Sequence, residues 1–461
     1  MRSYSEFSSD IYDIVKIIDE YKSSRIRNEM KIAKKYYQGH NVTIHNVKKM
    51  ICVEVDGKYQ NVVNPFVSNA KLPDKFVEDM VHQKVFTLFD RSPNIEGVNE
   101  DTKKVIKNTL DYALQQMGVE CSLCGVSYAY VEHGDKLKYK VFDSENCIGF
   151  FDDVSEELMA MVRFWKSKYY NSEKTIKFAE VYEENTYRLY KCEDTDFELL
   201  KKKSYLVDIE QNAIMKKETE KNWKSGIPIV VMKNDKYFHA DFDNSTRAQT
   251  DIIDIVSSDF ANNLSDFQEA FWIIKGLDEI SAADMGQFMR TIKNTNKAAL
   301  PEGADIDMKT IDIPYQARIA FLNEMKQKRI ENSGVINTDM VMKGSLTNIA
   351  IKLSSQKLML RVSRFEYEAY KTALRMIEFA KEYAKDNSTE EVTITFFKSY
   401  ISNDTEVIAN LTMSIGQISQ ETYLQKHPYV DDAEEEMDKI KKEGVSKLKL
   451  PEVKEVVEDE V

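Results

Sequence analysis

The sequence has few of the residues that break or crosslink a chain: its 461 residues include only 8 prolines, 15 glycines and 5 cysteines. The scarcity of proline and glycine argues against long structureless linkers. An odd number of cysteines in so large a chain argues against a disulfide framework and indicates reduced thiols, as in a cytoplasm. No run of about 18 apolar residues occurs, so no membrane-spanning helix is expected, and the N-terminus lacks the apolar core of a signal peptide.

Motifs that carry chemistry are also missing. The sequence contains no GxxxxGK[ST] phosphate-binding loop, no GxGxxG, no GxSxG and no HExxH, and its six histidines form no i, i+4 pair. The one match is CSLCG, whose Cys121 and Cys124 could be a redox pair or half of a zinc site. We favour packing in the core, because small thiols pack well where the chain enters the strand after Gly125. No catalytic residue, metal ligand or cofactor is therefore predicted.

Net charge limits the partners. The formal charge is −13, and charged residues make up 31% of the chain. A general nucleic-acid-binding protein usually presents a basic surface, so the balance argues against that class. It does not exclude DNA that slides past a weakly repulsive wall, where tight phosphate binding would be a hindrance. The length allows two or three domains with a sizeable core.

Hydrophobic periodicity predicts an α+β chain. Over residues 1–240 we expect helices at 11–35, 74–90 and 100–117, a hairpin at 126–143, and further strands out to about residue 233. Helical spacing returns near Thr250 with an apolar stripe and an opposed polar stripe. A small α/β insert is expected next, with a strand at 269–276, a helix at 282–294 and a strand at 307–314. Pro314 then opens a helix that stops at Gly334, followed by a loop and a long helix to about Lys385.

The long helix carries a basic stripe. Lys357, Arg361 and Arg364 fall at i, i+4 and i+7 and so share a face, which Lys371 and Arg375 extend. One interpretation is a solvated face or a face that forms salt bridges between subunits, which we favour. The other is direct contact with DNA, for which basic residues of the preceding helix and loop are better placed.

Six stretches carry a resemblance to a known family. They are YYQGH, GVSYAYVEHGD, DIIDIVSSDFANNLSDFQEAFWIIKG, TIDIPYQARIAFLNEMKQKRIENSGV, KGSLTNIAIK and ISQETYLQKHPYVDDAEEEMDKIKKE. In this order and spacing, from about residue 30 to 443, the chain resembles the portal proteins, or head-to-tail connectors, of tailed bacteriophages. The resemblance is to the siphophage type found in phages and prophages of Gram-positive bacteria.

The resemblance implies a portal fold built from named parts. These are an α+β wing (1–245), two stem helices (246–267 and 315–334), a small α/β clip (268–314), a tunnel loop (335–345), a long wing helix (346–394), a helical crown (395–445) and an acidic disordered tail (446–461). It implies a ring of twelve copies at one capsid vertex of the virion, assembled in the host cytoplasm, with no enzymatic activity. Its partners would be double-stranded DNA without sequence specificity, the terminase large subunit, head-completion or adaptor proteins, and the major capsid and scaffolding proteins, with no membrane.

The resemblance also implies roles for residues, by position. In the stem, one face of the first helix would pack a neighbouring subunit while its polar face meets water in the bore. The tunnel loop, with one acid and one lysine, is nearly neutral, which weakens any firm grip on DNA. The candidate residues are Asn337, Asp339, Lys343, Gly344 and Ser345 in the tunnel loop; Lys326, Lys328 and Arg329 as basic stem residues; Ile253, Val256, Phe260 and Leu264 at the subunit interface; and Trp272, Phe288 and Arg290 in the clip.

Two alternatives belong to other function classes. An ATPase or nuclease subunit of a packaging machine is disfavoured because the chain lacks a phosphate-binding loop and a carboxylate cluster of metal-ligand character. Another oligomeric structural protein of the virion, such as a capsid or adaptor component, is the alternative.

Overall fold

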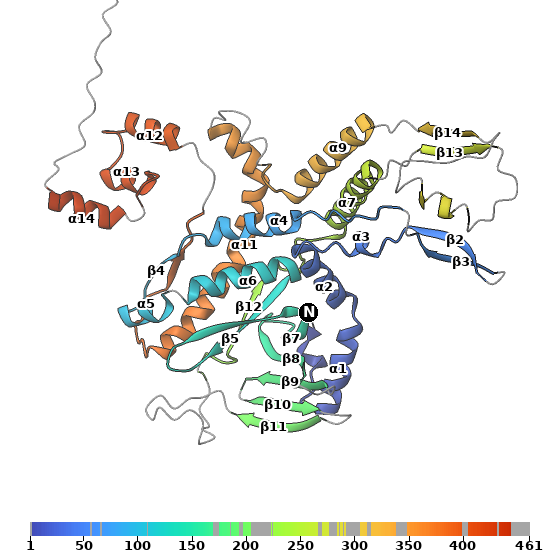
Figure 1. Cartoon of the computed structure of the whole chain (residues 1–461). Helices are drawn as coiled ribbons and strands as arrows, with labels where there is room; N and C mark the ends of the chain where they lie inside the picture. Colours follow the sequence, from blue (N-terminus) through green and yellow to red (C-terminus); the bar gives the residue numbers. More distant parts are fainter. Residues whose placement is uncertain are drawn as a thin grey trace, which may run out of the picture.

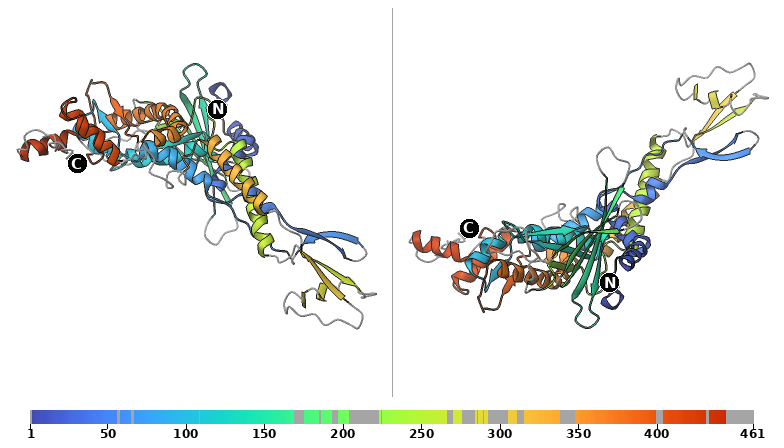
Figure 2. Two further views of the ribbon diagram at one scale, coloured as in Figure 1. Left: turned by 90° about the horizontal axis from the view of Figure 1, so that it is seen from above. Right: turned by 90° about the horizontal axis from the view of Figure 1, so that it is seen from below.

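The fold is taken from a computed structural model of the chain. It describes residues 2–55, 58–64, 67–107, 109–168, 175–184, 186–192, 197–203, 223, 225–265, 270–275, 284, 286–288, 290–291, 305–310, 315–337, 348–398, 404–430 and 433–443. Helices and strands are mixed along the chain, as the expected α+β class requires. The views in Figures 1 and 2 show a central body with helices α12–α14 at one end and a narrow projection at the other.

A six-stranded sheet forms one layer of the body, in the order β1-β7-β8-β9-β10-β11. Its strands are β1 (Arg2–Ser3), β7 (Cys147–Phe151), β8 (Leu158–Lys168), β9 (Thr175–Glu183), β10 (Tyr187–Cys192) and β11 (Phe197–Lys203). Helix α1 (Ile11–Ser23) buries Ile14, Ile17 and Ile18 in a core with strand residues such as Phe150 and Val162. Apolar residues at i, i+3 and i+4 of α1 thus cover the sheet.

The larger core surrounds the long helix α11 (Asn348–Tyr383), which has 36 residues. Around it pack α4 (Phe76–Phe89), α6 (Leu110–Cys124) and a three-stranded sheet in the order β12-β5-β6 (Figure 1). Strands β5 (Val126–Glu132) and β6 (Lys138–Phe142) form the expected hairpin, and β12 (Ile229–Lys233) pairs with β5. Phe365 and Phe379 of α11 have no solvent exposure, so this helix is the centre of the core.

Two of the helices expected to be continuous are broken. Residues 11–35 form α1 and α2 (Arg25–Tyr37), because the Ser24 side chain accepts a hydrogen bond from Arg27 N and so caps the second helix. Residues 100–117 form α5 (Glu100–Ile106) and the start of α6. Helix α6 continues to Cys124, and Gly125 joins it directly to β5, so the two CSLCG cysteines lie in the last turn of a helix that leads into the expected strand.

The projection consists of two helices and two β-ribbons. Helices α7 (Asn244–Ser265) and α9 (Tyr315–Ser333) pack on each other, and beyond them lie β13 (Ala270–Lys275) and β14 (Asp305–Thr310). Both views of Figure 2 place a second ribbon, β2 (Met50–Val55) with β3 (Lys58–Val63), at this same end. Short helix α3 (Val42–Asn46) precedes it and contacts α7. Residues 42–55 and 58–63, which belong to the segment 1–245 expected to be the wing, therefore accompany the projection.

The remaining elements agree in part with the sequence interpretation. Strand β15 (Thr393–Thr395) pairs with β4 (Asn94–Glu96) after the long helix. The C-terminal region contains α12 (Asp404–Met413), α13 (Gln420–Lys426) and α14 (Ala433–Glu443), where two helices were expected. The acidic tail from 446 lies outside the described residues. Of the insert helix predicted at 282–294, the described residues 284, 286–288 and 290–291 are helical.

Gly125 ends α6 in the left-handed region, with φ +80°. A Cβ there would lie 2.0 Å from the backbone oxygen of Phe238. We expect Gly125→Ala to lower the free energy of unfolding by about 2 kcal/mol or more, since it combines backbone strain with a backbone clash. Urea unfolding followed by tryptophan fluorescence measures the change.

Gly134→Ala is the matched control, because a Cβ at Gly134 finds its nearest neighbour 3.7 Å away. Equal stabilities of the two variants would contradict the steric requirement at Gly125.

Candidate functional site

The projecting helix α7 has a buried polar face. Thr250, Asp254, Ser258 and Asn262, spaced four residues apart, are all buried inside the protomer. The sequence interpretation placed a polar stripe of Asp251, Asp254, Ser258, Asn262 and Ser265 toward water. The structure contradicts this for Asp254, Ser258 and Asn262, which are buried, whereas Asp251 is partly buried and Ser265 is exposed. The face is covered by α3 and by the extended segment of residues 69–72, hereafter the strap.

Side chains of α7 replace strand partners for the strap. Asn262 accepts a hydrogen bond from Ala70 N at 2.7 Å and donates to Ala70 O at 3.2 Å. The Ser258 hydroxyl accepts from Leu72 N at 3.0 Å. Asp254 accepts from the Asn41 side chain at 2.7 Å. Because buried backbone groups need partners, this polar stripe lets an extended chain lie on a helix.

The apolar stripe of α7 is divided between core and surface. Ile253 is 2% exposed and packs inside the protomer, whereas Leu264 is 65% exposed. Val256 and Phe260 are partly buried, and the Arg318 guanidinium of α9 lies 5.9 Å from the Phe260 ring centre. The stripe thus leaves unburied apolar surface toward the distal end of α7, but Ile253 belongs to the fold and not to an outer face.

The basic residues of α9 differ in environment. Lys326 is exposed, and Lys328 is exposed with an ion pair to Glu324 at 2.7 Å. Arg329 is buried, pairs with Asp74 at 2.7 Å and lies 4.0 Å from the Phe76 ring centre. Its charge is used within the protomer, because a buried guanidinium needs a paired acid. This corrects the expectation that all three side chains present their charge to a channel.

The basic stripe of α11 holds the end of α9. Lys357 Nζ donates to Glu331 O at 2.9 Å, and Arg361 donates to Ser333 O. Cations that bond the last carbonyls of a helix also meet the negative end of its dipole. Gly334 follows with φ +71°, and a Cβ there would lie 3.3 Å from Arg361 Cδ. Lys357 is exposed, as the interpretation of a solvated face expects, and Arg361 is partly buried; both also bond within their own chain.

Lys357, Arg361 and the end of α9 that they bind are hereafter called the anchor, and Asp241 joins this anchor to the body. Its carboxylate forms ion pairs with Lys84 of α4 and Arg361 of α11, each at 2.7 Å, and accepts a hydrogen bond from Ser122. Burial would raise the pKa of Asp241, but Lys84 and Arg361 outweigh it and lower the pKa below its usual range. The stability that this ionised group contributes is present above about pH 4 and is lost as the pH falls.

Asp254 has the opposite balance. Burial raises its pKa to about 7, and the nearby Asp74 carboxylate adds to the shift, while the Asn41 hydrogen bond and Arg329 oppose it. A carboxyl that holds its proton near neutral pH donates as well as accepts hydrogen bonds. The protonation of Asp254, at the centre of the polar face of α7, therefore changes near neutral pH.

The other candidate residues are only partly described. Asn337 is partly buried, four residues after the end of α9 at Ser333, whereas Asp339, Lys343, Gly344 and Ser345 lie outside the described residues. Trp272 is in β13, opposite Met308 of β14. Phe288 is partly buried and Arg290 exposed, both in the helical part of the insert.

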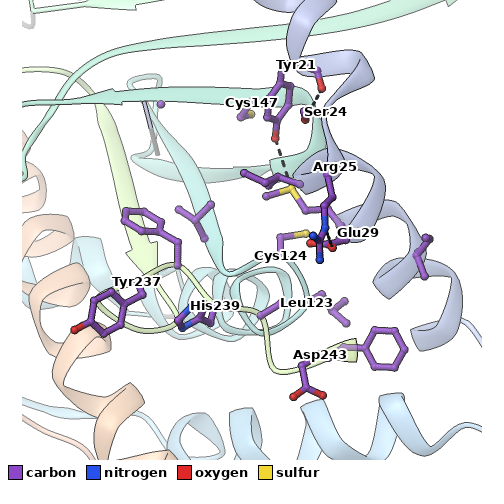
Figure 3. Close-up of a pocket in the computed structure, with 18 of the residues that line it drawn as sticks. Tyr21, Ser24, Arg25, Glu29, Leu123, Cys124, Cys147, Tyr237, His239 and Asp243 are labelled. Carbon is purple, nitrogen blue, oxygen red and sulfur yellow. Dashed lines mark hydrogen bonds and ion pairs between the residues drawn. The ribbon is translucent and has the colours of Figure 1, made fainter. Parts of the chain in front are cut away.

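A cavity of about 800 Å³ lies between α2, the end of α6, β7 and the segment 237–244 (Figure 3). Cys124 and Cys147 line it, and burial raises the pKa of both thiols well above the usual range, so neither is a thiolate nucleophile. Cys121 is fully buried and donates to Met232 O at 3.3 Å, as expected for packing cysteines. Among the residues that the structure describes, no group of three metal-ligating side chains occurs. In the same part of the chain, no helix is both long and apolar enough to span a membrane.

Comparison with known proteins decides the family. The model of the family described as phage portal protein, SPP1 Gp6-like, matches residues 16–447. The chain belongs to this family. The portal protein of Clostridium phage phiCD119 is 26% identical over 433 residues, covering 89% of this chain and 91% of that protein. The portal protein of Bacillus phage SPP1 is 21% identical over 450 residues, covering 93% and 86%. The expected membership of the portal family is thus confirmed, and with it a structural, non-enzymatic role in the virion.

Solved structures are similar at a coarser level. A chain from the neck of an empty gene transfer agent particle, computed with C6 symmetry, has a TM-score of 0.40 at 9% identity and covers 76% of this chain and 88% of its own. A chain from the neck of the native particle, computed with C12 symmetry, has a TM-score of 0.34 at 10% identity and covers 91% and 96%.

Sequence reasoning missed two features of this site. Asp241 and Lys84 gave no local signal, because their pairing depends on segments more than 150 residues apart. The β2–β3 ribbon was also missed, although the alternation in ICVEV and the dipeptide Asp-Gly that follows it in the sequence could have indicated a hairpin.

We expect Asp241→Ala to lower the free energy of unfolding by about 3–5 kcal/mol, because it leaves buried Lys84 and half-buried Arg361 without their shared acid. The matched control is Asp19→Ala, which removes an exposed pair with Lys22 at 2.8 Å and should cost about 1 kcal/mol or less. Chemical unfolding of both variants gives the comparison. A loss at Asp241 no larger than that at Asp19 would count against the anchor.

The raised pKa of Asp254 predicts that the free energy of unfolding depends on pH. Between about pH 4, where the unfolded carboxyl titrates, and pH 7, the folded state holds a proton that the unfolded state has lost. The contribution of this group to stability therefore falls as the pH rises through that window.

Asp254→Asn keeps the hydrogen bonds of the protonated acid without titrating, so its stability should decline less between pH 4 and 7. Unfolding curves at several pH values test this, with Glu390→Gln at an exposed acid outside α7 as control. Parallel pH profiles for wild type and Asp254→Asn would show that Asp254 does not carry the effect.

Proposed function

We propose that the chain forms a ring of twelve copies at one capsid vertex and that double-stranded DNA passes through its centre during packaging and ejection. Family membership over residues 16–447 carries this proposal. The projecting pair α7 and α9 supports it, because the pair displays apolar residues that the protomer does not cover: Leu264 (65% exposed), Tyr315 (55%), Ile319 (43%) and Phe321 (41%).

The parts of the protomer take the following roles in this proposal. Helices α7 and α9 are the stem, and the insert with β13 and β14 is the clip. The body with α11 is the wing, and α12–α14 form the crown. Residues 335–345 are the tunnel loop, with Asn337, Asp339, Lys343, Gly344 and Ser345 nearest the DNA. Arg361 and Lys357 fix the helix end from which that loop departs.

Weak electrostatics suit a conduit. A chain with a formal charge of −13 repels phosphates at close range, and salt screens the repulsion beyond about 10 Å. Lys326 and Lys328 of α9 are exposed and supply shallow contacts to phosphates that do not depend on sequence. Arg329 takes no part in these contacts, because Asp74 holds it inside the protomer.

The clip is the proposed docking surface for other virion proteins. Trp272, Phe288 and Arg290 lie in the insert at the far end of the projection, where a partner reaches them first. The partners we assign to it are the terminase large subunit during packaging and head-completion or adaptor proteins afterwards. The rest of the ring would meet the major capsid and scaffolding proteins, with assembly in the cytoplasm of the bacterial host.

Mass and projection images test the ring directly. The purified chain should have about twelve times the protomer mass of 53.5 kDa by native mass spectrometry and show a central hole in negative stain. A chain that stays at 53.5 kDa at high concentration would overturn the proposal.

Leu264→Asp tests the stem contact. The substitution places a charge on an apolar side chain that is 65% exposed in the protomer, so the protomer should fold while rings fail to form. Light scattering after size-exclusion chromatography measures the mass, and circular dichroism confirms the fold. Ile253→Asp is the contrast, because Ile253 is buried in the protomer and its substitution should destabilise the fold itself. Rings of normal mass from Leu264→Asp would remove α7 from the interface.

A further inference from the structure

The two β-ribbons of the projection lie at one level. The base of β2–β3 is tied to the last turns of α7, through Lys49 with Asp259 at 3.4 Å and through the strap bonds of Asn262. Strand β13 begins five residues after α7 ends at Ser265. Figure 2 shows both ribbons leaving this point without crossing back to the body. The ribbons β2–β3 and β13–β14 therefore both lie near the end of α7 at Ser265.

Strand β13 lies at the edge of its ribbon. It pairs with β14, and no other strand among the described residues pairs along its second edge. The sequence AFWIIK has no charge before Lys275, whereas β14, DIDMKT, alternates charged and apolar residues. Edge strands usually carry charges or prolines that block further pairing, and apolar runs are typical of central strands. The sequence of β13 therefore suits a strand with neighbours on both sides.

Strand β3 offers a complementary edge. All six of its side chains are exposed, with Tyr59 at 78% and Val63 at 53%. A two-stranded ribbon is marginally stable alone in water, so this one needs a further partner. Asn64 N donates inward to Lys49 O at 2.8 Å. Because inward and outward groups alternate in an antiparallel pair, the amides of Tyr59, Asn61 and Val63 point to the free edge.

We infer that β3 of one copy pairs along β13 of the neighbouring copy, giving a four-stranded sheet, β2-β3-β13-β14, shared by two subunits. This inference rests on the proposed ring. The two strands match in length, since each has six residues. Pairing of two unlike edges is heterologous, so it repeats around a ring, whereas β13 with β13 would close a two-fold dimer. The main-chain bonds supply the affinity, as in strand addition to other sheet edges.

Hydrogen exchange of the wild-type ring and of the Leu264→Asp protomer tests the pairing. Peptides that cover residues 58–63 and 270–275 should exchange at least ten-fold more slowly in the ring. In the ring, Asn61→Pro removes one outward donor and should abolish the added protection of 270–275. Asn61→Ala, which keeps the amide, should preserve it. Exchange of peptides from α11 confirms that each variant is folded.

The outcomes separate the two proposals. A wild-type mass of 53.5 kDa overturns the ring, and the pairing with it. A full ring in which both peptides exchange as fast as in the protomer overturns the pairing alone. Protection of 270–275 that survives Asn61→Pro also overturns it, because another segment would then cover β13.

Discussion

The carboxylate of Asp241 and the guanidinium of Arg361 form the contact on which the projection depends. Arg361 donates to Ser333 O, the last carbonyl of α9, and pairs with Asp241 at once, so one side chain joins the end of a helix to the body of the protomer. Lys84 of α4 supplies the second cation, which keeps the buried acid ionised. Since the loop at 335–345 starts one residue after Gly334, the position of its first residues follows from this network.

The polar and apolar faces of α7 are reversed relative to a simple amphipathic helix. The buried polar face is satisfied by the strap and by Asn41, so it costs little despite its burial. Apolar side chains such as Leu264 remain outside. The described hydrogen bonds thus satisfy the buried polar face of α7, while exposed apolar side chains remain on the projection. In the proposed ring, contacts with neighbouring copies would cover these apolar side chains without breaking the bonds of the polar face.

Sequence reasoning recovered the elements whose signal is local. The hairpin β5–β6, the strands β8, β9, β10 and β12, the helix from Tyr315 to Gly334 and the long helix α11 all follow from periodicity and turn residues. It failed where a distant segment decides the environment. Hydropathy assigns Ser258 and Asn262 to water, and only the strap, almost 200 residues earlier in the chain, makes them core residues. The role of Arg361 within the stripe of α11 was missed for the same reason, since helix spacing cannot show that Ser333 O lies beside it.

The two buried acids of the site respond to pH in opposite ways. Asp241 stabilises the fold in its ionised form, because Lys84 and Arg361 share its carboxylate. Asp254 favours its protonated form, because burial and the nearby Asp74 carboxylate raise its pKa. Acidification therefore weakens the anchor at the end of α9 and relieves the polar face of α7. The two effects fall in different ranges, below about pH 4 for the first and between about pH 4 and 7 for the second. Near neutral pH Asp241 stays ionised and the anchor is intact. In the same range Asp254, on the face of α7 that the strap covers, gains or loses its proton.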